Sequence, residues 1–433
     1  MKRKIEKTLA AWKDKPNRKP LLLQGARQVG KTYASLDFGK AYYQNCVYFN
    51  LEGSTELAAI FKRDLDPQRI LRELSVRCGQ SIFKHETLII LDEIQACPRA
   101  LTSLKYFCEN APEYHVIAAG SLLGVAVKRE QDFSFPVGKV DMVTMYPMDF
   151  EEFLWSKHHR DLADLIRESY EEYTPLSLHD MALDLYKTYL VVGGMPQAVA
   201  EYVRTSDFNY VTAVHHILDN SYTGDMPKYA TAQEAMRIRA AWQSISAQLA
   251  KDNHKFQYKI IKSGARAYEY REPLDWLQSA GLILRCGLAT EGKMPLSAYE
   301  DHGAFKVYML DVGMLCSKFD IAPNVVLTSP HSFDGFKGAL AENYIMQALV
   351  TGGFKPYYWA SDGKAEVDFV FQDRQGNIIP LEAKSADNVR ARSLRTYVDR
   401  YKPTYQIRVS ARNFGHEGNL KSIPLYAMFC LEP

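Results

Sequence analysis

The chain has 433 residues, of which 47% are hydrophobic and 24% are charged. This length exceeds the usual span of one hydrophobic core, so we expect two to four domains. The composition excludes a disordered or fibrous protein. The formal net charge of +2 gives no general signature of polyanion binding, so a site for DNA or RNA would have to be local.

The sequence favours a cytoplasmic protein without a membrane span. Seven cysteines are widely scattered and form no CxxC pair, which fits a reducing compartment better than a zinc site. The first twenty residues lack the apolar core of a signal peptide and predict an amphipathic helix. The longest apolar stretch, residues 116–127, is far shorter than the roughly 20 residues that a membrane span requires.

Between Pro20 and Pro147, short apolar runs rich in β-forming residues alternate with longer segments suited to helices. These runs lie at residues 21–24, 46–51, 87–92, 115–120 and 143–147. The alternation is typical of an α/β fold with a doubly wound parallel sheet.

A glycine-rich segment, GARQVGKT, follows the first apolar run and precedes a helix-compatible segment. It satisfies the P-loop pattern GxxxxGK[ST], and the strand-to-helix context is the one this motif requires. Backbone N–H groups of such a loop surround the β-phosphate, the lysine neutralises the β- and γ-phosphates, and the threonine ligates Mg²⁺. We therefore predict an ATP- and Mg²⁺-binding loop made of Gly25, Ala26, Arg27, Gln28, Val29, Gly30, Lys31, Thr32 and Tyr33.

A second acidic element appears in LIILDE, residues 88–93. An apolar run that ends in two carboxylates predicts a buried parallel strand that presents them at its C-terminal edge, where ligands bind. We expect Asp92 to orient the metal through water and Glu93 to polarise the attacking water. The alternative is an ordinary strand-to-helix turn followed by a surface pair of acids.

A third apolar run, residues 115–119, leads into Gly120 and Ser121. A polar residue at the end of this strand would lie between the acidic pair and the γ-phosphate, so Ser121 is a candidate sensor of the nucleotide. A plain turn serine is the alternative, since Gly-Ser is a common turn pair.

The chain beyond residue 150 changes character twice. Residues 151–235 are predicted to form a helical lid or connector, with polar loops at 156–162 and 171–180 and a break at 193–196. Residues 236–320 read as helix, helix and a β-wing, which suggests a winged-helix-like module. This module carries basic residues among aromatic ones, an arrangement that suits phosphate contacts, although a solvated face over core aromatics is the alternative. The basic residues are Lys251, His254, Lys255, Lys259, Lys262, Arg266 and Arg271.

The last segment, residues 330–433, predicts one more α/β domain with four polar residues in a recognisable order. Glu342 lies at the margin of an apolar helix stripe, Asp368 in a strand, and Glu382 and Lys384 in the partner strand of a hairpin. This arrangement resembles the PD-(D/E)xK nuclease core. The resemblance implies that the carboxylates hold Mg²⁺ against a phosphate, with Asp368 and Glu382 as metal ligands. It also implies that Lys384 polarises the attacking water. The alternative is a salt-bridged cluster in a degenerate scaffold that binds a partner.

Several motifs in order resemble a large family of prokaryotic AAA-type ATPases with a C-terminal nuclease-like domain. They are GARQVGKT, LDEIQ at 91–95, AAGSLLG at 118–124, YPMDFEEFL at 146–154 and YLVVGGMPQAV at 189–199. The resemblance covers nearly the whole chain and implies an ATPase with a nuclease-like C-terminal domain. Together with the patterns above, it leads us to expect four regions: an AAA-like ATPase domain (1–150), the helical connector (151–235), the winged-helix-like module (236–320) and the nuclease-like domain (330–433).

The resemblance also bears on assembly and partners. In that family a Gly-Arg pair often precedes the strand before PxxFxEF, whereas here the pair is Gly138-Lys139. Lysine lacks the bidentate fork of an arginine finger, so Lys139 would serve a homo-oligomer less well, and Arg129 is another candidate. We expect an ATPase that handles DNA or RNA, with a regulatory switch that recruits a protein partner as the alternative.

Overall fold

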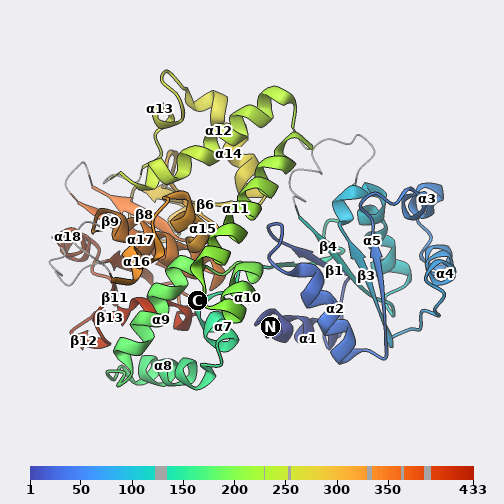
Figure 1. The fold of residues 1–433 in the computed structure, drawn as a ribbon, viewed down its shortest axis with the longest axis horizontal. Helices are drawn as coiled ribbons and strands as arrows, with labels where there is room; N and C mark the ends of the chain where they lie inside the picture. Colours follow the sequence, from blue (N-terminus) through green and yellow to red (C-terminus); the bar gives the residue numbers. More distant parts are fainter. Residues whose placement is uncertain (122–133, 229, 252–254, 329–333, 362–364, 385–391) are drawn as a thin grey trace. The chain divides into compact units, whose positions relative to one another are not determined.

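The computed structural model describes residues 1–121, 134–228, 230–251, 255–328, 334–361, 365–384 and 392–433 (Figure 1). The chain divides into two compact units. The first contains residues 1–146 and 279–281, and the second contains residues 147–278 and 282–433. None of the helices in the described ranges is long and apolar enough to cross a membrane.

The first unit is built on a five-stranded sheet in the order β2-β3-β4-β1-β5. Every neighbouring pair is parallel, which confirms the predicted doubly wound sheet. The strands are β1 (Leu21–Gln24), β2 (Asn45–Asn50), β3 (Thr87–Asp92), β4 (His115–Gly120) and β5 (Asp141–Thr144). Helix α1 (Ile5–Lys13) precedes β1. The described helices between the strands are α2 (Lys31–Tyr42), α3 (Thr55–Arg63), α4 (Pro67–Cys78), the short η1 (Ile94–Ala96) and α5 (Pro98–Asn110).

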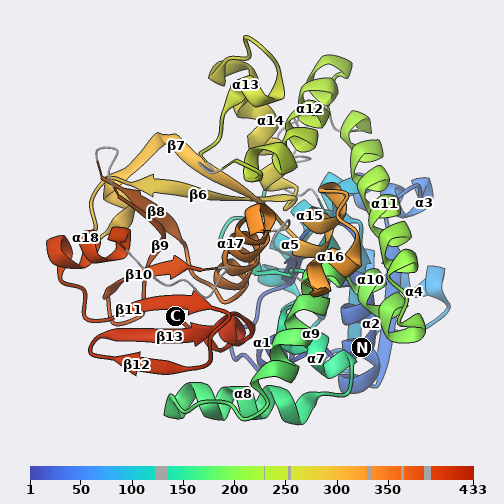
Figure 2. The same ribbon diagram turned by 60° about the vertical axis from the view of Figure 1, so that its left-hand side comes forward.

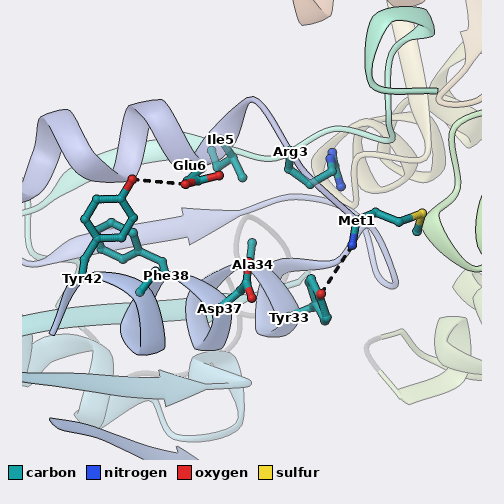
Figure 3. A pocket seen from close by; sticks show the side chains of 10 residues that line it. Met1, Arg3, Ile5, Glu6, Tyr33, Ala34, Asp37, Phe38 and Tyr42 are labelled. Atoms are coloured by element: carbon teal, nitrogen blue, oxygen red, sulfur yellow. Dashed lines mark hydrogen bonds between the residues drawn. The ribbon is translucent and has the colours of Figure 1, made fainter. Parts of the chain in front are cut away.

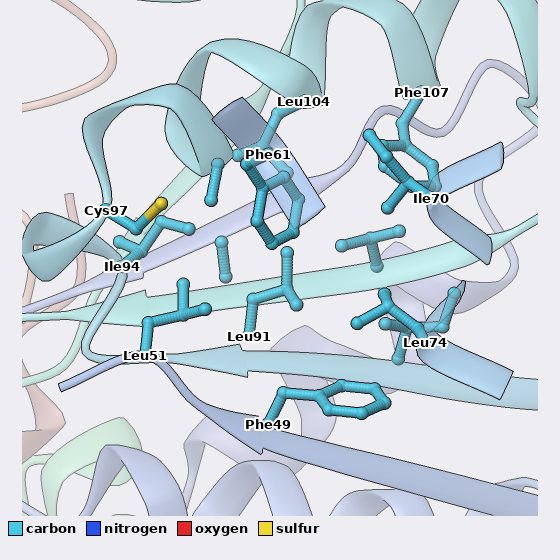
Figure 4. Packing of buried hydrophobic residues seen from close by; sticks show 14 of the residues in the cluster. Phe49, Leu51, Phe61, Ile70, Leu74, Leu91, Ile94, Cys97, Leu104 and Phe107 are labelled. Atoms are coloured by element: carbon cyan, nitrogen blue, oxygen red, sulfur yellow. The ribbon is translucent and has the colours of Figure 1, made fainter. Parts of the chain in front are cut away.

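A hydrophobic core lies between three helices and the sheet (Figure 4). Phe61 of α3, Ile70 of α4 and Phe107 of α5 pack over side chains of β2 and β3 such as Phe49 and Leu91. Strands β3 and β4 are buried along their whole length, as continuous apolar runs in a parallel sheet require. The sheet therefore holds the C-terminal ends of its strands at one fixed edge, which is where the candidate site lies.

The second unit begins with helices and contains the second sheet. Its first helices are α7 (Phe150–Ser156), α8 (Arg160–Glu172), α9 (His179–Val192), α10 (Pro196–Thr205), α11 (Phe208–Asp225), η2 (Met226–Lys228), α12 (Ala232–Leu249), α13 (Tyr258–Ile261) and α14 (Ala267–Ser279). The predicted helical connector is thus helical, with interruptions near the expected loops. Between α12 and α14, the described residues 255–266 contain only the four-residue helix α13.

The remaining elements of this unit form an eight-stranded mixed sheet with flanking helices (Figure 2). The strands are β6 (Ile283–Ala289), β7 (Glu300–Met309), β8 (Tyr357–Ala360), β9 (Glu366–Gln372), β10 (Ile378–Ala383), β11 (Gln406–Ser410), β12 (Gly415–Glu417) and β13 (Leu420–Pro424). The helical segments are η3 (Leu296–Tyr299), α15 (Val312–Lys318), α16 (Pro323–Thr328), α17 (Asp334–Thr351), α18 (Arg392–Tyr401) and η5 (Leu425–Cys430).

The order of the strands is β12-β13-β11-β10-β9-β8-β6-β7. The β6–β7 hairpin, which the sequence suggests is a wing, pairs through β6 with β8 in parallel. The wing and the C-terminal α/β region therefore share one sheet. The finer boundaries at residues 235 and 320 remain predictions, and the change of unit after Tyr146 lies close to the boundary expected at 150.

The segment GGMP, between α9 and α10, has a packing role. Gly193 has a φ of +68°, and a Cβ there would lie 2.2 Å from Oδ1 of Asp311. A Cβ on Gly194 would lie 1.9 Å from the carbonyl oxygen of Met148. The carboxylate of Asp311 instead accepts the N–H of Gly194 at 2.6 Å and that of Met314 at 3.0 Å. Only glycine fits both positions, so this motif fixes the meeting point of three segments.

Candidate nucleotide site and acidic cluster

The predicted P-loop lies between β1 and α2 of the first unit. Gly25 has a φ of +147°, and a Cβ on it would lie 2.2 Å from the carbonyl oxygen of Met145. Gly30, at the N-terminus of α2, has a φ of +97°. Both positions require glycine, for close approach at Gly25 and for the left-handed backbone at Gly30. The loop leads directly into the N-terminus of α2, where the helix dipole stabilises an anion.

Lys31 is buried within this loop, with 8% of its surface exposed. Its Nζ donates to the carbonyl oxygens of Gly25 at 3.0 Å and Ala26 at 2.8 Å. Burial lowers the pKa of Lys31 to about 8, although the charges of Glu93 and Asp92 act in the opposite direction. A desolvated ammonium at the centre of the loop is a strong point of attraction for phosphate.

Thr32 and Asp92 join the two sequence motifs. The Thr32 hydroxyl donates to Oδ2 of Asp92 at 2.7 Å, across 60 residues of sequence. The Tyr48 hydroxyl of β2 donates to the same oxygen at 3.0 Å, and the Glu93 N–H donates to Oδ1 at 3.0 Å. A hydroxyl and a carboxylate are the hard oxygen donors that Mg²⁺ prefers, with phosphate oxygens and water completing its shell. The donor set therefore fits the predicted metal.

Tyr48 is a residue that the sequence analysis missed. It lies in β2 two positions before Asn50, which pairs with Asp92, so Tyr48 and Asn50 are on the same face of that strand. Burial, followed by the charge of Asp92, raises the pKa of Tyr48. The register of β2 against β3 places the Tyr48 hydroxyl at the site, and no sequence motif predicts this position.

Glu93 and Ser121 are joined by a third side chain, Gln95. Glu93 follows β3 with a φ of +51°, and Ser121 follows β4. Nε2 of Gln95 donates to Oε2 of Glu93 at 2.5 Å and to Oγ of Ser121 at 3.4 Å. Gln95 is 9% exposed and Ser121 is 2% exposed. The candidate general base and the candidate sensor are thus within one side chain of each other.

Tyr33 and the N-terminal segment border a small pocket next to the P-loop, between α1 and α2 (Figure 3). The Tyr33 side chain is 57% exposed, and its hydroxyl lies 3.4 Å from the N-terminal amine of Met1. Arg3 donates to the carbonyl oxygen of Val29 in the loop at 3.0 Å and to that of Tyr146 at 2.8 Å. The N-terminal segment therefore braces the P-loop, an interaction with no motif in the sequence.

Of the two residues considered for an arginine-finger role, the structure describes only Lys139. Lys139 forms an ion pair with Glu109 of its own chain at 2.9 Å. Arg129 lies outside the described residues. Neither observation tests assembly, so the homo-oligomer remains a prediction.

The four C-terminal residues come from the expected elements. Glu342 lies in α17, Asp368 in β9, Glu382 in β10, and Lys384 directly after it. Strands β9 and β10 pair as the predicted antiparallel hairpin. Oδ2 of Asp368 accepts the Ala383 N–H at 2.8 Å, and Nζ of Lys384 lies 2.8 Å from Oε1 of Glu382.

The electrostatics of Asp368 reflect its neighbours. Although its side chain keeps some exposure, burial and then the negative charge of Glu342 raise its pKa to about 7 from the usual 3.8. Glu382 acts in the same direction, and the positive charge of Lys306 acts against it. The charges of Glu342 and Glu382 thus act on Asp368, while the sharing of one metal ion by these carboxylates stays a prediction.

The cluster also contains a buried lysine that the sequence analysis did not include. Lys306 of β7 is 1% exposed, and its Nζ lies 2.7 Å from Oε1 of Glu366 and 3.8 Å from Oε2 of Glu342. Burial alone would lower its pKa, but the charges of Glu342, Glu366 and Asp368 raise it overall. The Tyr308 hydroxyl donates to Glu342 at 3.1 Å.

Metal binding by this cluster has no support from the geometry. Across the described part of the chain, no group of three or more His, Cys, Asp and Glu side chains is placed to hold a metal ion. The assignment of Asp368 and Glu382 as metal ligands remains a prediction. The charge that faces Glu342 and Glu366 belongs to an ammonium group instead.

Comparisons with known proteins agree with the first unit. Residues 17–154 match the model of an AAA domain, and this range contains the P-loop, Asp92, Glu93 and Ser121. The first unit is therefore a P-loop ATPase domain of the AAA type. Residues 183–324 match a domain of unknown function, DUF8612, and residues 337–428 match another, DUF4143. No curated protein matches the chain.

Solved structures that resemble the chain are distant. The Walker-type ATPase PABY2304 of Pyrococcus abyssi is 16% identical, with 73% of this chain and 95% of that one covered and a TM-score of 0.43. The Aeropyrum pernix ORC2 protein, in ADPNP-ADP complexes, is 13% identical over 75% and 91%, with a TM-score of 0.32. The Aeropyrum pernix ORC1 protein, in complex with DNA, is 12% identical over 73% and 90%, with a TM-score of 0.27.

Proposed function

We propose that the chain binds ATP with Mg²⁺ and hydrolyses it at the P-loop of the first unit. The observation that carries this proposal is the 2.7 Å hydrogen bond from Thr32 to Asp92. It places the hydroxyl of one motif against the carboxylate of the other at the C-terminal edge of the sheet. Thr32 and Asp92 would hold Mg²⁺ there, and the metal would supply positive charge against the phosphates.

The side chains then have separate tasks. Lys31 exchanges the carbonyl oxygens of Gly25 and Ala26 for phosphate oxygens, and this exchange keeps its ammonium paired. Thr32 and Asp92 hold the metal and its water. Glu93 accepts a proton from the attacking water.

Two variants test this proposal. In Lys31→Ala we expect ATP affinity and turnover to fall sharply, because phosphate charge is left uncompensated. In Glu93→Gln we expect ATP binding to persist while turnover falls on the order of 100-fold or more. Lys40→Ala, an exposed lysine of the same helix, is the matched control. Calorimetric titration and phosphate release measure the two quantities. Unchanged affinity and turnover in Lys31→Ala would refute the P-loop assignment.

A second proposal is that the chain handles nucleic acid through the basic segment 255–271. This segment has five basic residues and one acidic residue, a net charge of +4, whereas the whole chain carries +2. The rest of the chain therefore has a net charge of −2. Its basic residues are Lys255, Lys259, Lys262, Arg266 and Arg271, and all but Lys255 are exposed.

The aromatic residues of this segment anchor it to the sheet. The Phe256 N–H donates to the Phe305 carbonyl of β7 at 2.9 Å, and the two rings stack with centroids 5.3 Å apart. Gln248 exchanges two hydrogen bonds of 2.9 Å with the backbone of Gln257. Lys259 and Lys262 thus project from a fixed backbone. Tyr268, six residues after Lys262, has 72% of its surface exposed. Fixed cations with an exposed ring suit a phosphate backbone and a stacked base.

Binding is tested with fluorescently labelled single-stranded and double-stranded DNA and RNA at several salt concentrations. We expect the double variant Lys259→Glu, Lys262→Glu to bind more weakly and to show a shallower dependence on salt, by about 0.9 in slope for each duplex phosphate that is no longer neutralised. Lys40→Glu, Lys62→Glu in the first unit is a control with the same change of charge. Equal affinity and equal salt dependence in the two double variants would refute this surface.

The acidic cluster of the C-terminal region bears on whether the chain cleaves nucleic acid. We infer that the cluster is an internally paired network and that the C-terminal region does not cleave nucleic acid. The buried ammonium of Lys306 between Glu342 and Glu366 supports this inference, because carboxylates committed to a lysine are less available to a metal. Incubation of DNA and RNA with Mg²⁺ should leave both intact. Mg²⁺-dependent cleavage that Asp368→Ala abolishes would restore the nuclease alternative.

A further inference from the structure

Gln95 has a buried polar atom that the fold does not use. Only its amide nitrogen can donate to the ionised carboxylate of Glu93, so Nε2 is the atom that faces Glu93 and Ser121. The carbonyl atom Oε1 is then left over. It is buried and has no hydrogen-bond partner among the described residues. A buried acceptor without a partner costs free energy, so its position next to Glu93 calls for an explanation.

The surroundings of Gln95 give that explanation. The short helix η1 holds it directly after Glu93, and its side chain reaches from the end of β3 to Ser121 at the end of β4. Both strand ends lie at the edge where the P-loop holds the triphosphate in the proposed function.

We propose that Gln95 is the positioning residue for the nucleophilic water in ATP hydrolysis. Its Nε2 fixes the carboxylate of Glu93, and its Oε1 accepts a hydrogen bond from the second hydrogen of the same water. Two acceptors on one water fix both of its O–H groups, so that a lone pair of its oxygen can be directed toward the γ-phosphorus. A glutamine that orients the attacking water is a known element of phosphoryl transfer by P-loop enzymes of other classes.

The step balances without another reactant. One O–H bond of the water breaks and its proton moves to Glu93, while the water oxygen forms a bond to the γ-phosphorus. The bond from that phosphorus to the β–γ bridging oxygen breaks, and its electron pair leaves with ADP. Gln95 exchanges no proton; it holds two of the participants in place. This inference rests on the proposed ATPase function.

The test replaces Gln95 by methionine, which has nearly the same length and no hydrogen-bonding group. We expect the kcat for ATP to fall on the order of 100-fold while the KM for ATP and the affinity for ADP with Mg²⁺ stay within about twofold, since the phosphate contacts remain. Gln68→Met, at an exposed position of α4, is the matched control and should keep both constants.

A structural role for Gln95 would give different results. Disruption of the site would lower nucleotide affinity together with turnover, and would be visible as a weaker thermal shift on addition of ADP and Mg²⁺. A second readout is the double variant Glu93→Gln, Gln95→Met. It should be no slower than Glu93→Gln alone, because residues that act as a unit are not additive. A further loss equal to that of the single variant would overturn the proposal.

Failure of the ATPase function and failure of this inference are distinguishable. If wild-type protein releases no phosphate from ATP, the proposed function is wrong. If wild type hydrolyses ATP, Glu93→Gln is inactive, and Gln95→Met retains the wild-type kcat, then the ATPase assignment stands and the role of Gln95 is wrong.

Discussion

Replacement of Lys306 by methionine removes a buried ammonium and keeps a side chain of similar length. Nζ lies 2.7 Å from Glu366 and 3.8 Å from Glu342, and Lys306 is 1% exposed. Removal of one partner from a buried ion pair costs about 3–5 kcal/mol, because it leaves an uncompensated charge. The side chains of Glu342 and Glu366 keep 14% and 34% exposure, so water screens part of that charge. We therefore expect a loss near the lower end, about 3 kcal/mol in the free energy of unfolding.

Unfolding in urea, followed by tryptophan fluorescence, measures this loss. Four of the five tryptophans lie in the second unit, so the signal reports mainly on its unfolding, and urea keeps the ionic strength constant. Lys355→Met is the control, because that lysine is 72% exposed and 3.5 Å from Glu300, and should cost less than about 1 kcal/mol. Equal, small losses in both variants would refute the reasoning.

Three further variants test other parts of the structure. Gly25→Ala should weaken binding of ADP with Mg²⁺ at least tenfold in calorimetry, because the new Cβ would lie 2.2 Å from a carbonyl oxygen. The control Gly53→Ala also has a positive φ but meets open space, and should leave this affinity unchanged. Asp368 has a folded pKa raised to about 7, so between about pH 4 and 7 the folded state binds a proton that the unfolded state does not. Stability should therefore fall as pH rises through this window, and Asp368→Asn should flatten that fall in urea titrations. Arg167→Met removes two hydrogen bonds that the buried Glu151 accepts, and should lower the free energy of unfolding by about 3 kcal/mol. The control Arg204→Met, at an exposed position, should lower it by less than about 1 kcal/mol.

The first unit was largely predictable because its constraints are local. The backbone of a P-loop needs glycine at particular positions, and a buried parallel strand needs a continuous apolar run, so both leave a pattern in the sequence. The strand ends then carried Asp92, Glu93 and Ser121 to one edge. Gln95 is the last residue of the motif LDEIQ, yet its role was not predicted, because the motif does not distinguish a glutamine that spans two strand ends from one that faces solvent.

The second unit was predictable in its elements and less so in their pairing. The β9–β10 hairpin and the helices between residues 150 and 250 followed from turn residues and apolar periodicity. The parallel pairing of β6 with β8 joins strands separated by about 70 residues, and no local signal specifies such a partner. The motifs YPMDFEEFL and GGMP were useful for recognition, yet their side chains serve packing. Asp149 and Glu152 form a capping box, and Gly193 and Gly194 accommodate Asp311 and Met148.

Lys306 shows how pairing between distant strands changes the meaning of a motif. Taken alone, Asp368, Glu382 and Lys384 have the order of a nuclease site, and a lysine in the wing has the appearance of one more surface cation. The shared sheet brings β7 and α17 together, so that the ammonium of the wing faces Glu342 and Glu366. A buried acidic cluster must be neutralised by a metal, by protons or by a basic side chain. A carboxylate that is paired with one of these is less available to the others. Here the wing supplies the cation, so the chemistry of the C-terminal region depends on a residue that lies outside the motif from which its chemistry was inferred.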